Sequence, residues 1–280
     1  MKQTFLLAAA LLSGLMSWGQ IQVPQPSPSS MMKQTVGLTQ VTVEYSRPSM
    51  RGRTIFGDLV PYDAIWRTGA NMNTTISFSD PVTVSGTTLE AGTYAIYTKP
   101  GMDSWEVYFY TDTNNGGLPR KWDDSKVAAT ATTQVYKMED PVQTFTITID
   151  NLTNNGAVIG MLWENVYVGV PFEVPTATKA QASVEAVMSG PSANDYFQAA
   201  SYYHDEGMDL AKAKEWIDKA VAANPKAFWM SRRQSLIYAA MGDTKGAIAA
   251  AKKSLAAAED AGNNDYIKMN KDSLKEWGAM

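Results

Sequence analysis

The chain has 280 residues, of which 45% are hydrophobic and 19% are charged, with a formal net charge of −4, one His and no Cys. This apolar fraction is too high for a disordered chain, and the length predicts one large domain or two ordinary ones. The lack of Cys excludes disulfides and thiolate sites, and a single His excludes a multi-His metal centre within one chain. The acidic net charge argues against nucleic acid as a partner.

The N-terminus has the pattern of a secretory signal peptide over residues 1–19. Lys2 supplies a positive charge, residues 5–12 form an apolar run, and Ser17-Trp18-Gly19 offers small residues at both recognition positions of a cleavage site. No later apolar run in the sequence approaches membrane-spanning length. We therefore expect an exported protein, periplasmic or secreted, with no membrane span once the signal is removed.

A proline-rich stretch follows the predicted cleavage site. Pro24, Pro26 and Pro28 fall within five residues, which prevents a helix and disfavours a central strand. Together with the neighbouring serines they predict a solvated, polyproline-type spacer over residues 20–33.

From residue 34 to residue 175 the sequence alternates with a period of two. Val41, Val43 and Tyr45 alternate with polar residues, and later runs rich in β-branched and aromatic residues repeat the pattern between turn signals. Eight or nine short strands without an intervening helical pattern predict an antiparallel β-sandwich or barrel-like domain over 34–175.

The pattern becomes helical after a predicted linker over residues 176–191. Ala213 and Ala247 are 34 residues apart, as are Val221 and Leu255. This is the period of tetratricopeptide helix pairs, in which small residues let the paired helices approach closely. We therefore predict a small tetratricopeptide-like α-helical region over 192–280, with a plain pair of helical hairpins as the alternative. The fold class is then mainly β plus α.

Residues 45–71 differ from the rest of the β domain. Four of the chain's seven arginines fall within residues 47–67, in a domain that is otherwise acidic. Arginine favours planar, bidentate contacts with carboxylates or phosphates, and irregular loops on a β scaffold are common binding sites. For an anionic or sugar-like small ligand, the candidate binding residues are Arg47, Arg51, Arg53, Tyr62, Trp66, Arg67 and Asn71.

Two other interpretations of this segment stay open. In one, the arginines form ion pairs with Asp58, Asp63 and other acids of the domain and act as an internal staple. In the other, Asp58 or Asp63 is the acid or base of a carbohydrate-active hydrolase, because glycoside cleavage needs two carboxylates at a set separation. Residues 112–123 partly imitate a calcium loop, but a hairpin turn is the better interpretation. We expect no catalytic residue, metal or cofactor beyond these alternatives.

Several blocks of the β domain are similar to the signature of a known family. They include Arg51-Gly52-Arg53, Trp66-Arg67-Thr68-Gly69-Ala70-Asn71, Leu89-Glu90-Ala91-Gly92-Thr93-Tyr94 and Trp163-Glu164. These blocks resemble domain-of-unknown-function family 2911 over residues 34–175. The resemblance implies a fold and an exported protein of Bacteroidetes-like bacteria, but no catalytic residue, because the family has no assigned activity.

These patterns together predict an exported envelope protein that is a non-catalytic binding module. The arginine-bearing loop would bind an anionic or sugar-like ligand. The helical region would bind a protein or peptide, because stacked helix pairs leave a concave face. The carbohydrate-active hydrolase and a purely structural envelope protein are the alternatives.

Overall fold

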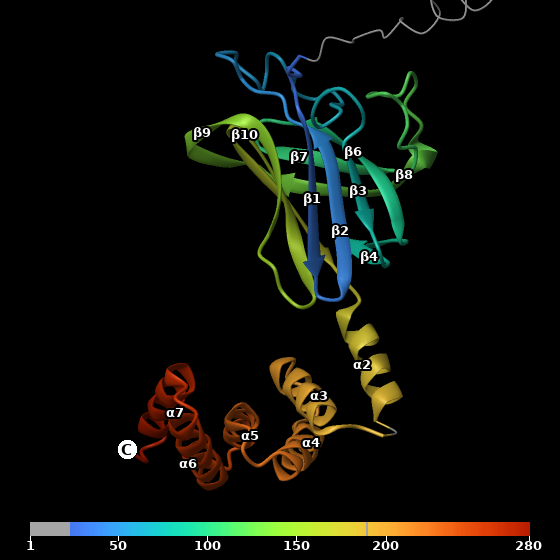
Figure 1. The fold of residues 1–280 in the computed structure, drawn as a ribbon. Coiled ribbons are helices and arrows are strands. Elements are labelled where there is room, and N and C mark those ends of the chain that lie inside the picture. Colours follow the sequence, from blue (N-terminus) through green and yellow to red (C-terminus); the bar gives the residue numbers. More distant parts are fainter. Residues whose placement is uncertain (1–22, 189) are drawn as a thin grey trace, which may run out of the picture. The chain divides into compact units, whose positions relative to one another are not determined.

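The computed structural model of the protein describes residues 23–188 and 190–280, and the predicted signal peptide lies outside these residues. The chain divides into two compact units after Thr176. Strands make up the first unit and helices make up the second (Figure 1).

Two antiparallel sheets form the β domain. The strands are β1 (Ser29–Val36), β2 (Thr39–Ser46), β3 (Thr75–Phe78), β4 (Val82–Val84), β5 (Thr87–Leu89), β6 (Gly92–Pro100), β7 (Ser104–Tyr110), β8 (Val127–Gln134), β9 (Tyr136–Asp150) and β10 (Gly156–Glu173). One sheet has the order β1-β2-β3-β6-β7-β8 and the other has the order β5-β4-β10-β9. This confirms the predicted antiparallel, sandwich-like domain, and within the described residues neither sheet closes into a barrel.

One hydrophobic core contains residues from both sheets. In β2, Val41, Val43 and Tyr45 are buried, whereas the residues between them face outward. Burying each of these valines stabilises the fold by roughly 1.5–3 kcal/mol. Gly37 lies in the two-residue turn between β1 and β2 and has φ +56°. A hairpin turn of this length requires a positive φ, which glycine adopts readily.

The structure differs from the sequence prediction at three places in this domain. Strand β1 begins at Ser29, inside the predicted spacer, because it pairs with β2 along its whole length. Residues 26–28 are not free in solvent either, since their carbonyls accept hydrogen bonds from the arginine-bearing loop. Strands β9 and β10 have 15 and 18 residues instead of being short. Their register shifts around Glu164, which marks an irregular, bulged region.

Six helices follow the β domain in the part of the chain that the structure describes. They are α2 (Thr176–Val187), α3 (Ala193–Asp205), α4 (Leu210–Ala223), α5 (Phe228–Ala240), α6 (Thr244–Asp260) and α7 (Asn264–Glu276). Helix α2 occupies most of the predicted linker, because the stretch is rich in the strong helix formers Ala, Lys, Gln and Glu. None of the described helices has the length and apolarity needed to cross a membrane.

The 34-residue spacing corresponds to equivalent positions in two helix pairs. Helix α3 packs on α4, and α5 packs on α6. Asp209 and Asp243 each cap the second helix of a pair by accepting backbone N–H groups. Ala213 and Ala247, one turn further on, are both fully buried. The repeat therefore conserves a helix start and a close contact between helices.

A partly buried polar network in the helical unit makes its stability dependent on pH. The Asp218 carboxylate accepts hydrogen bonds from Lys214 Nζ at 2.8 Å, Gln234 Nε2 at 2.7 Å and Tyr238 Oη at 2.7 Å. Burial raises the pKa of Asp218, but the hydrogen bonds outweigh burial and hold this pKa below its ordinary value. A carboxyl with a lowered folded-state pKa stabilises the fold above its unfolded-state pKa, and this contribution is lost as the pH falls through the folded-state pKa.

We therefore expect Asp218→Asn to reduce the loss of stability on acidification. Urea unfolding at about pH 7 and about pH 3 would measure this, because the ordinary pKa of an aspartate is about 3.9 and the pKa of Asp218 in the folded protein is lowered from it. The free energy of unfolding of the wild type should fall more between the two conditions than that of the variant. An equal fall in both proteins would show that Asp218 contributes no linkage.

Candidate functional site

Residues 47–74 connect β2 to β3 and are the arginine-bearing loop. They cross the end of the sandwich opposite the β1–β2 turn (Figure 1). Four non-glycine residues of this segment, Arg51, Asp63, Thr68 and Asn71, have positive φ. This left-handed conformation is unfavourable for residues with a Cβ atom, above all for the β-branched Thr68. Strained backbone persists only where the surroundings hold it, and it concentrates at functional sites.

A cluster of aromatic rings holds the segment against the core. Phe56 and Trp66 from the segment pack against Trp105 of β7, Phe145 of β9 and Trp163 of β10. The Trp66 and Trp163 rings are stacked, with centroids 5.8 Å apart and planes at 18°. Trp163 is fully buried, whereas Trp66 keeps part of its surface exposed. The cluster therefore leaves part of the Trp66 ring exposed at the surface, and the buried Trp163 ring is stacked against it.

Glu164 holds the start of the segment in place. It lies at the irregular region of β10 with φ +53°. Its two carboxylate oxygens accept the backbone N–H groups of Ile55 at 3.2 Å and Phe56 at 3.3 Å. The carboxylate thus satisfies donors that have no strand partner. The sequence Trp163-Glu164 within a strand gives no sign of this role.

A surface pocket of about 370 Å³ lies beside the aromatic cluster. Four predicted ligand-binding residues line it, namely Arg53, Trp66, Arg67 and Asn71. The other lining residues are Ser27, Pro48, Leu59, Val60, Gly69, Ala70 and Trp163. Among the described residues that line the pocket there are two guanidinium groups and no carboxylate. We call this cavity the arginine pocket.

Two of the predicted residues serve the fold instead of the pocket. The Arg47 guanidinium donates from Nε to the Phe145 carbonyl at 3.0 Å and from Nη2 to Thr146 Oγ1 at 2.6 Å. It therefore ties the segment to β9. Tyr62 packs against the hydrophobic core. Neither side chain lines the arginine pocket.

Main-chain carbonyls are the principal acceptors for the remaining arginines. Arg53 donates from Nε to the Met50 carbonyl at 2.9 Å and from Nη2 to the Ser49 carbonyl at 2.8 Å. Arg67 donates from Nη1 to the Asn71 carbonyl at 3.1 Å. Arg51 lies outside the pocket and donates to the Pro26 carbonyl. None of these guanidinium groups pairs with a carboxylate among the residues described, so Asp58 and Asp63 do not neutralise the cluster.

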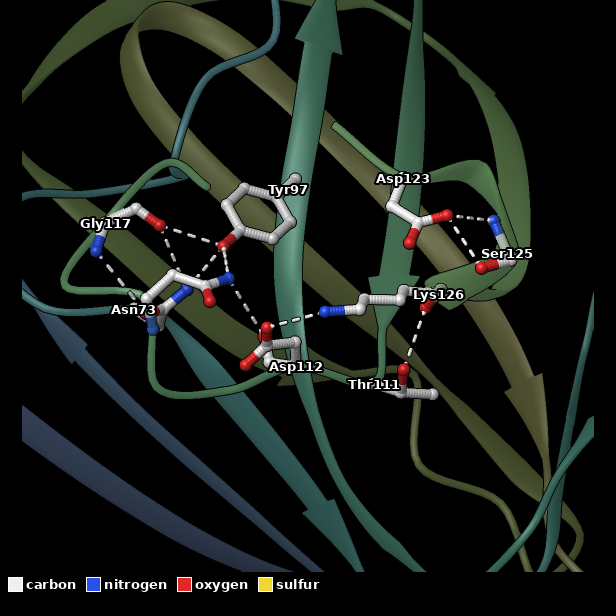
Figure 2. Close-up of polar contacts among 9 residues, drawn as sticks. Asn73, Tyr97, Thr111, Asp112, Gly117, Asp123, Ser125 and Lys126 are labelled. Carbon is white, nitrogen blue, oxygen red and sulfur yellow. Dashed lines mark hydrogen bonds and ion pairs between the residues drawn. The ribbon is translucent and has the colours of Figure 1, made fainter. Parts of the chain in front are cut away.

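A buried hydrogen-bond network positions the loop that packs on Arg67 (Figure 2). Asn73 Nδ2 donates to Tyr97 Oη at 2.6 Å, and Tyr97 Oη donates to the Gly117 carbonyl at 2.8 Å. Asn73 Oδ1 accepts the backbone N–H of Asn115 at 3.0 Å. A Cβ atom on Gly117 would lie 2.7 Å from Arg67 Nη1, so only glycine fits here without moving that side chain. The network therefore holds this loop against Arg67, which is one of the residues that line the arginine pocket.

The two carboxylates considered for acid–base chemistry lie elsewhere. Asp58 is exposed in a turn, and Asp63 is exposed and lines a separate pocket of about 400 Å³. In that second pocket Glu106 lies 3.2 Å from Lys99 Nζ and accepts a hydrogen bond from Tyr108 Oη at 2.8 Å. The hydrogen bonds from Tyr108 and then Lys99 lower the pKa of Glu106. A lowered pKa keeps this carboxyl ionised, which suits an ion-pair partner better than a general acid.

The loop with the partial calcium pattern is closed by protein contacts. Asp112 forms an ion pair with Lys126 at 3.0 Å, and Asp123 accepts hydrogen bonds from the backbone and hydroxyl of Ser125 (Figure 2). Across residues 23–188 and 190–280, no three His, Asp or Glu side chains come together in a group able to hold a metal ion.

Comparison with known proteins links the β domain to a family. A family model described as "Protein of unknown function (DUF2911)" matches residues 27–172. No curated protein matches the chain. The matched region contains every residue that lines the arginine pocket.

Proposed function

Because the chain belongs to the DUF2911 family, whose matched region includes the whole pocket lining, we propose that the β domain is a non-catalytic binding module for a small carboxylate-bearing ligand. One observation carries this proposal. The arginine pocket combines two guanidinium groups, an amide and an aromatic ring, with no carboxylate in its described lining. Such a lining is electrostatically incomplete until an anion enters.

The chemistry of the lining selects the ligand class. Within the described part of the chain Arg67 donates a hydrogen bond only from Nη1, so its other N–H groups are left for a carboxylate. The partly exposed Trp66 ring offers a flat apolar face for a sugar ring or a side chain. A volume of about 370 Å³ lies in the range of small-molecule sites. A uronic acid or a small acylated amino acid has this combination of groups.

Paired acidic and neutral probes test the proposal. We expect D-glucuronate or N-acetyl-L-phenylalanine to bind in isothermal titration, and the corresponding neutral amide to bind far more weakly. Arg67→Gln should weaken binding of the acid by about 10- to 100-fold, because hydrogen bonds to charged groups contribute about 1.5–3 kcal/mol. Arg120→Gln makes the same charge change at an exposed residue outside the pocket and should leave affinity unchanged.

Three outcomes would contradict this assignment. Neither acid binding the wild type would remove the ligand class. Equal binding of acid and amide, or equal weakening by both variants, would indicate nonspecific charge attraction. Release of p-nitrophenol from chromogenic glycosides, lost in Asp63→Asn, would favour the hydrolase instead.

We also propose that the protein is exported and that its helical unit binds a protein or peptide. The signal pattern of residues 1–19 supports export. The packed helix pairs, with Trp229 37% exposed on α5, support a partner surface. Fractionation of expressing cells tests the first part, and an uncleaved cytoplasmic protein would reject it.

A further inference from the structure

The segment Pro26–Pro28 runs along the arginine-bearing loop and is bound there by its main chain. Three consecutive carbonyls each accept one hydrogen bond from residues 47–71. The pairs are Pro26 with Arg51 Nη2 at 2.9 Å, Ser27 with Asn71 Nδ2 at 3.1 Å, and Pro28 with the backbone N–H of Arg47 at 2.9 Å. Ser27 is also one of the residues that line the arginine pocket.

Proline is suited to this way of binding. A Pro-Ser-Pro stretch has a single backbone N–H, so it offers carbonyls while leaving few donors without partners. The fixed φ of proline also lowers the entropy that an extended segment loses when it docks. The Pro/Ser composition that predicts a solvated spacer is therefore equally suited to a segment that is bound along a loop.

Asn71 connects the segment Pro26–Pro28 to the arginine pocket. Its side chain binds the Ser27 carbonyl and also Ser46 Oγ at 3.2 Å, while the residue itself lines the pocket. Its own carbonyl accepts the hydrogen bond from Arg67 Nη1. Displacing Ser27 would therefore remove a pocket wall and release a contact of the residue that positions Arg67.

We infer that the segment Pro26–Pro28 is a wall of the ligand site, with Ser27 as a residue that determines which ligands fit. This inference rests on the proposed function of the arginine pocket. The carboxylate ligand then binds when the segment Pro26–Pro28 is docked on the arginine-bearing loop. Ligand binding and docking of the segment then stabilise each other, as linkage requires.

The absence of Cys from the chain allows a direct test at Ser27. In Ser27→Cys the introduced thiol is the only one, and its alkylation by N-ethylmaleimide reports access to this position. Saturating D-glucuronate or N-acetyl-L-phenylalanine should slow alkylation at least about fivefold, because a pocket ligand buries most of the surface that it contacts. Met31→Cys is the control, since Met31 is 66% exposed on β1 and outside the pocket, and its rate should not change.

A second test weakens docking without altering any charged group of the pocket. The double variant Pro26→Gly, Pro28→Gly keeps the carbonyls but frees the segment, and it should weaken binding of the acid by about 4- to 30-fold. Pro24→Gly changes an exposed proline outside the pocket lining and should bind as the wild type does.

The outcomes separate this inference from the proposal on which it rests. If an acid binds the wild type but neither protects the thiol at Ser27→Cys nor binds the double variant more weakly, the pocket is a site and the segment is not part of it. If neither acid binds the wild type, both proposals fall. Protection of the thiol in Ser27→Cys, together with weaker binding by the double variant, supports the inference that Pro26–Pro28 is a wall of the ligand site.

Discussion

Replacing Trp163 with Ala is expected to lower the free energy of unfolding of the β domain by about 3–5 kcal/mol. Trp163 is only 1% exposed and contacts two regions of the chain. Its ring packs against Phe56 and Trp66 of the arginine-bearing loop and against Phe145 of β9, and its indole N–H donates to the Gln143 carbonyl of β9 at 3.2 Å. The alanine would leave a large cavity between the two sheets, which close packing elsewhere cannot fill. It would also remove the ring on which Trp66 is stacked. Urea unfolding followed by circular dichroism measures the loss.

Trp229→Ala provides the matched comparison for this loss. Trp229 lies on α5 and is 37% exposed, so its removal should cost well under half as much as the removal of Trp163. Trp163→Phe keeps most of the ring volume and should recover part of the lost stability. Similar small losses for Trp163→Ala and Trp229→Ala would mean that the aromatic cluster does not hold the arginine-bearing loop.

The second large effect is expected at Asn73. This residue is 8% exposed and makes four hydrogen bonds. Nδ2 donates to Tyr97 Oη at 2.6 Å and to the Gly117 carbonyl at 3.2 Å, while Oδ1 accepts the backbone N–H groups of Asn115 at 3.0 Å and Gly117 at 3.4 Å. Asn73→Ala removes the acceptor of the Asn115 and Gly117 backbone N–H groups where water has little access, whereas Tyr97 Oη and the Gly117 carbonyl keep their mutual hydrogen bond. Since each unsatisfied buried group costs about 1–3 kcal/mol, we expect a loss of about 2–4 kcal/mol.

Amide hydrogen exchange distinguishes this loss from a general weakening of the fold. In Asn73→Ala the amides of Asn115 and Gly117 should exchange faster, while the amides of β2 keep the protection that the remaining global stability allows. Asn114→Ala changes an exposed amide side chain of the same loop and should leave both stability and exchange close to those of the wild type. Unchanged exchange at Gly117 in Asn73→Ala would show that the network does not hold the loop against Arg67.

The β domain could be predicted from sequence because its signal is local. In β2 the period-two alternation of Val41, Val43 and Tyr45 is also the pattern of burial. The extent of β9 could not be predicted in this way, because its first half contains charged residues and Pro141 and has little buried surface. The sequence does not predict the helix in the linker, for a related reason. Composition alone favours a helix over residues 176–187, but no apolar stripe marks one.

The arginine pocket could be predicted only in part. Composition predicts ligand-binding roles for Arg53, Trp66, Arg67 and Asn71, and these four residues line one cavity. It could not separate them from Arg47, whose guanidinium reaches β9 through contacts across 98 and 99 residues of sequence. Trp163 and Ser27 were not among the predicted residues, since a strand tryptophan usually indicates core and a Pro-Ser stretch usually indicates spacer. Only the tertiary structure brings these two residues to the same cavity.

The links between the arginine-bearing loop and β10 have a consequence for the order of folding. Ile55 and Glu164 meet across 109 residues of sequence, and Phe56 joins Trp163 over a similar separation. Contacts of this kind form late, because the entropy of closing a long loop opposes them until the intervening strands are in place. Helices α3–α4 and α5–α6 meet their partners across short turns and need no such closure. During refolding, helical signal should therefore recover before the Trp66 environment does, and the arginine pocket should be among the last parts of the chain to acquire its native form.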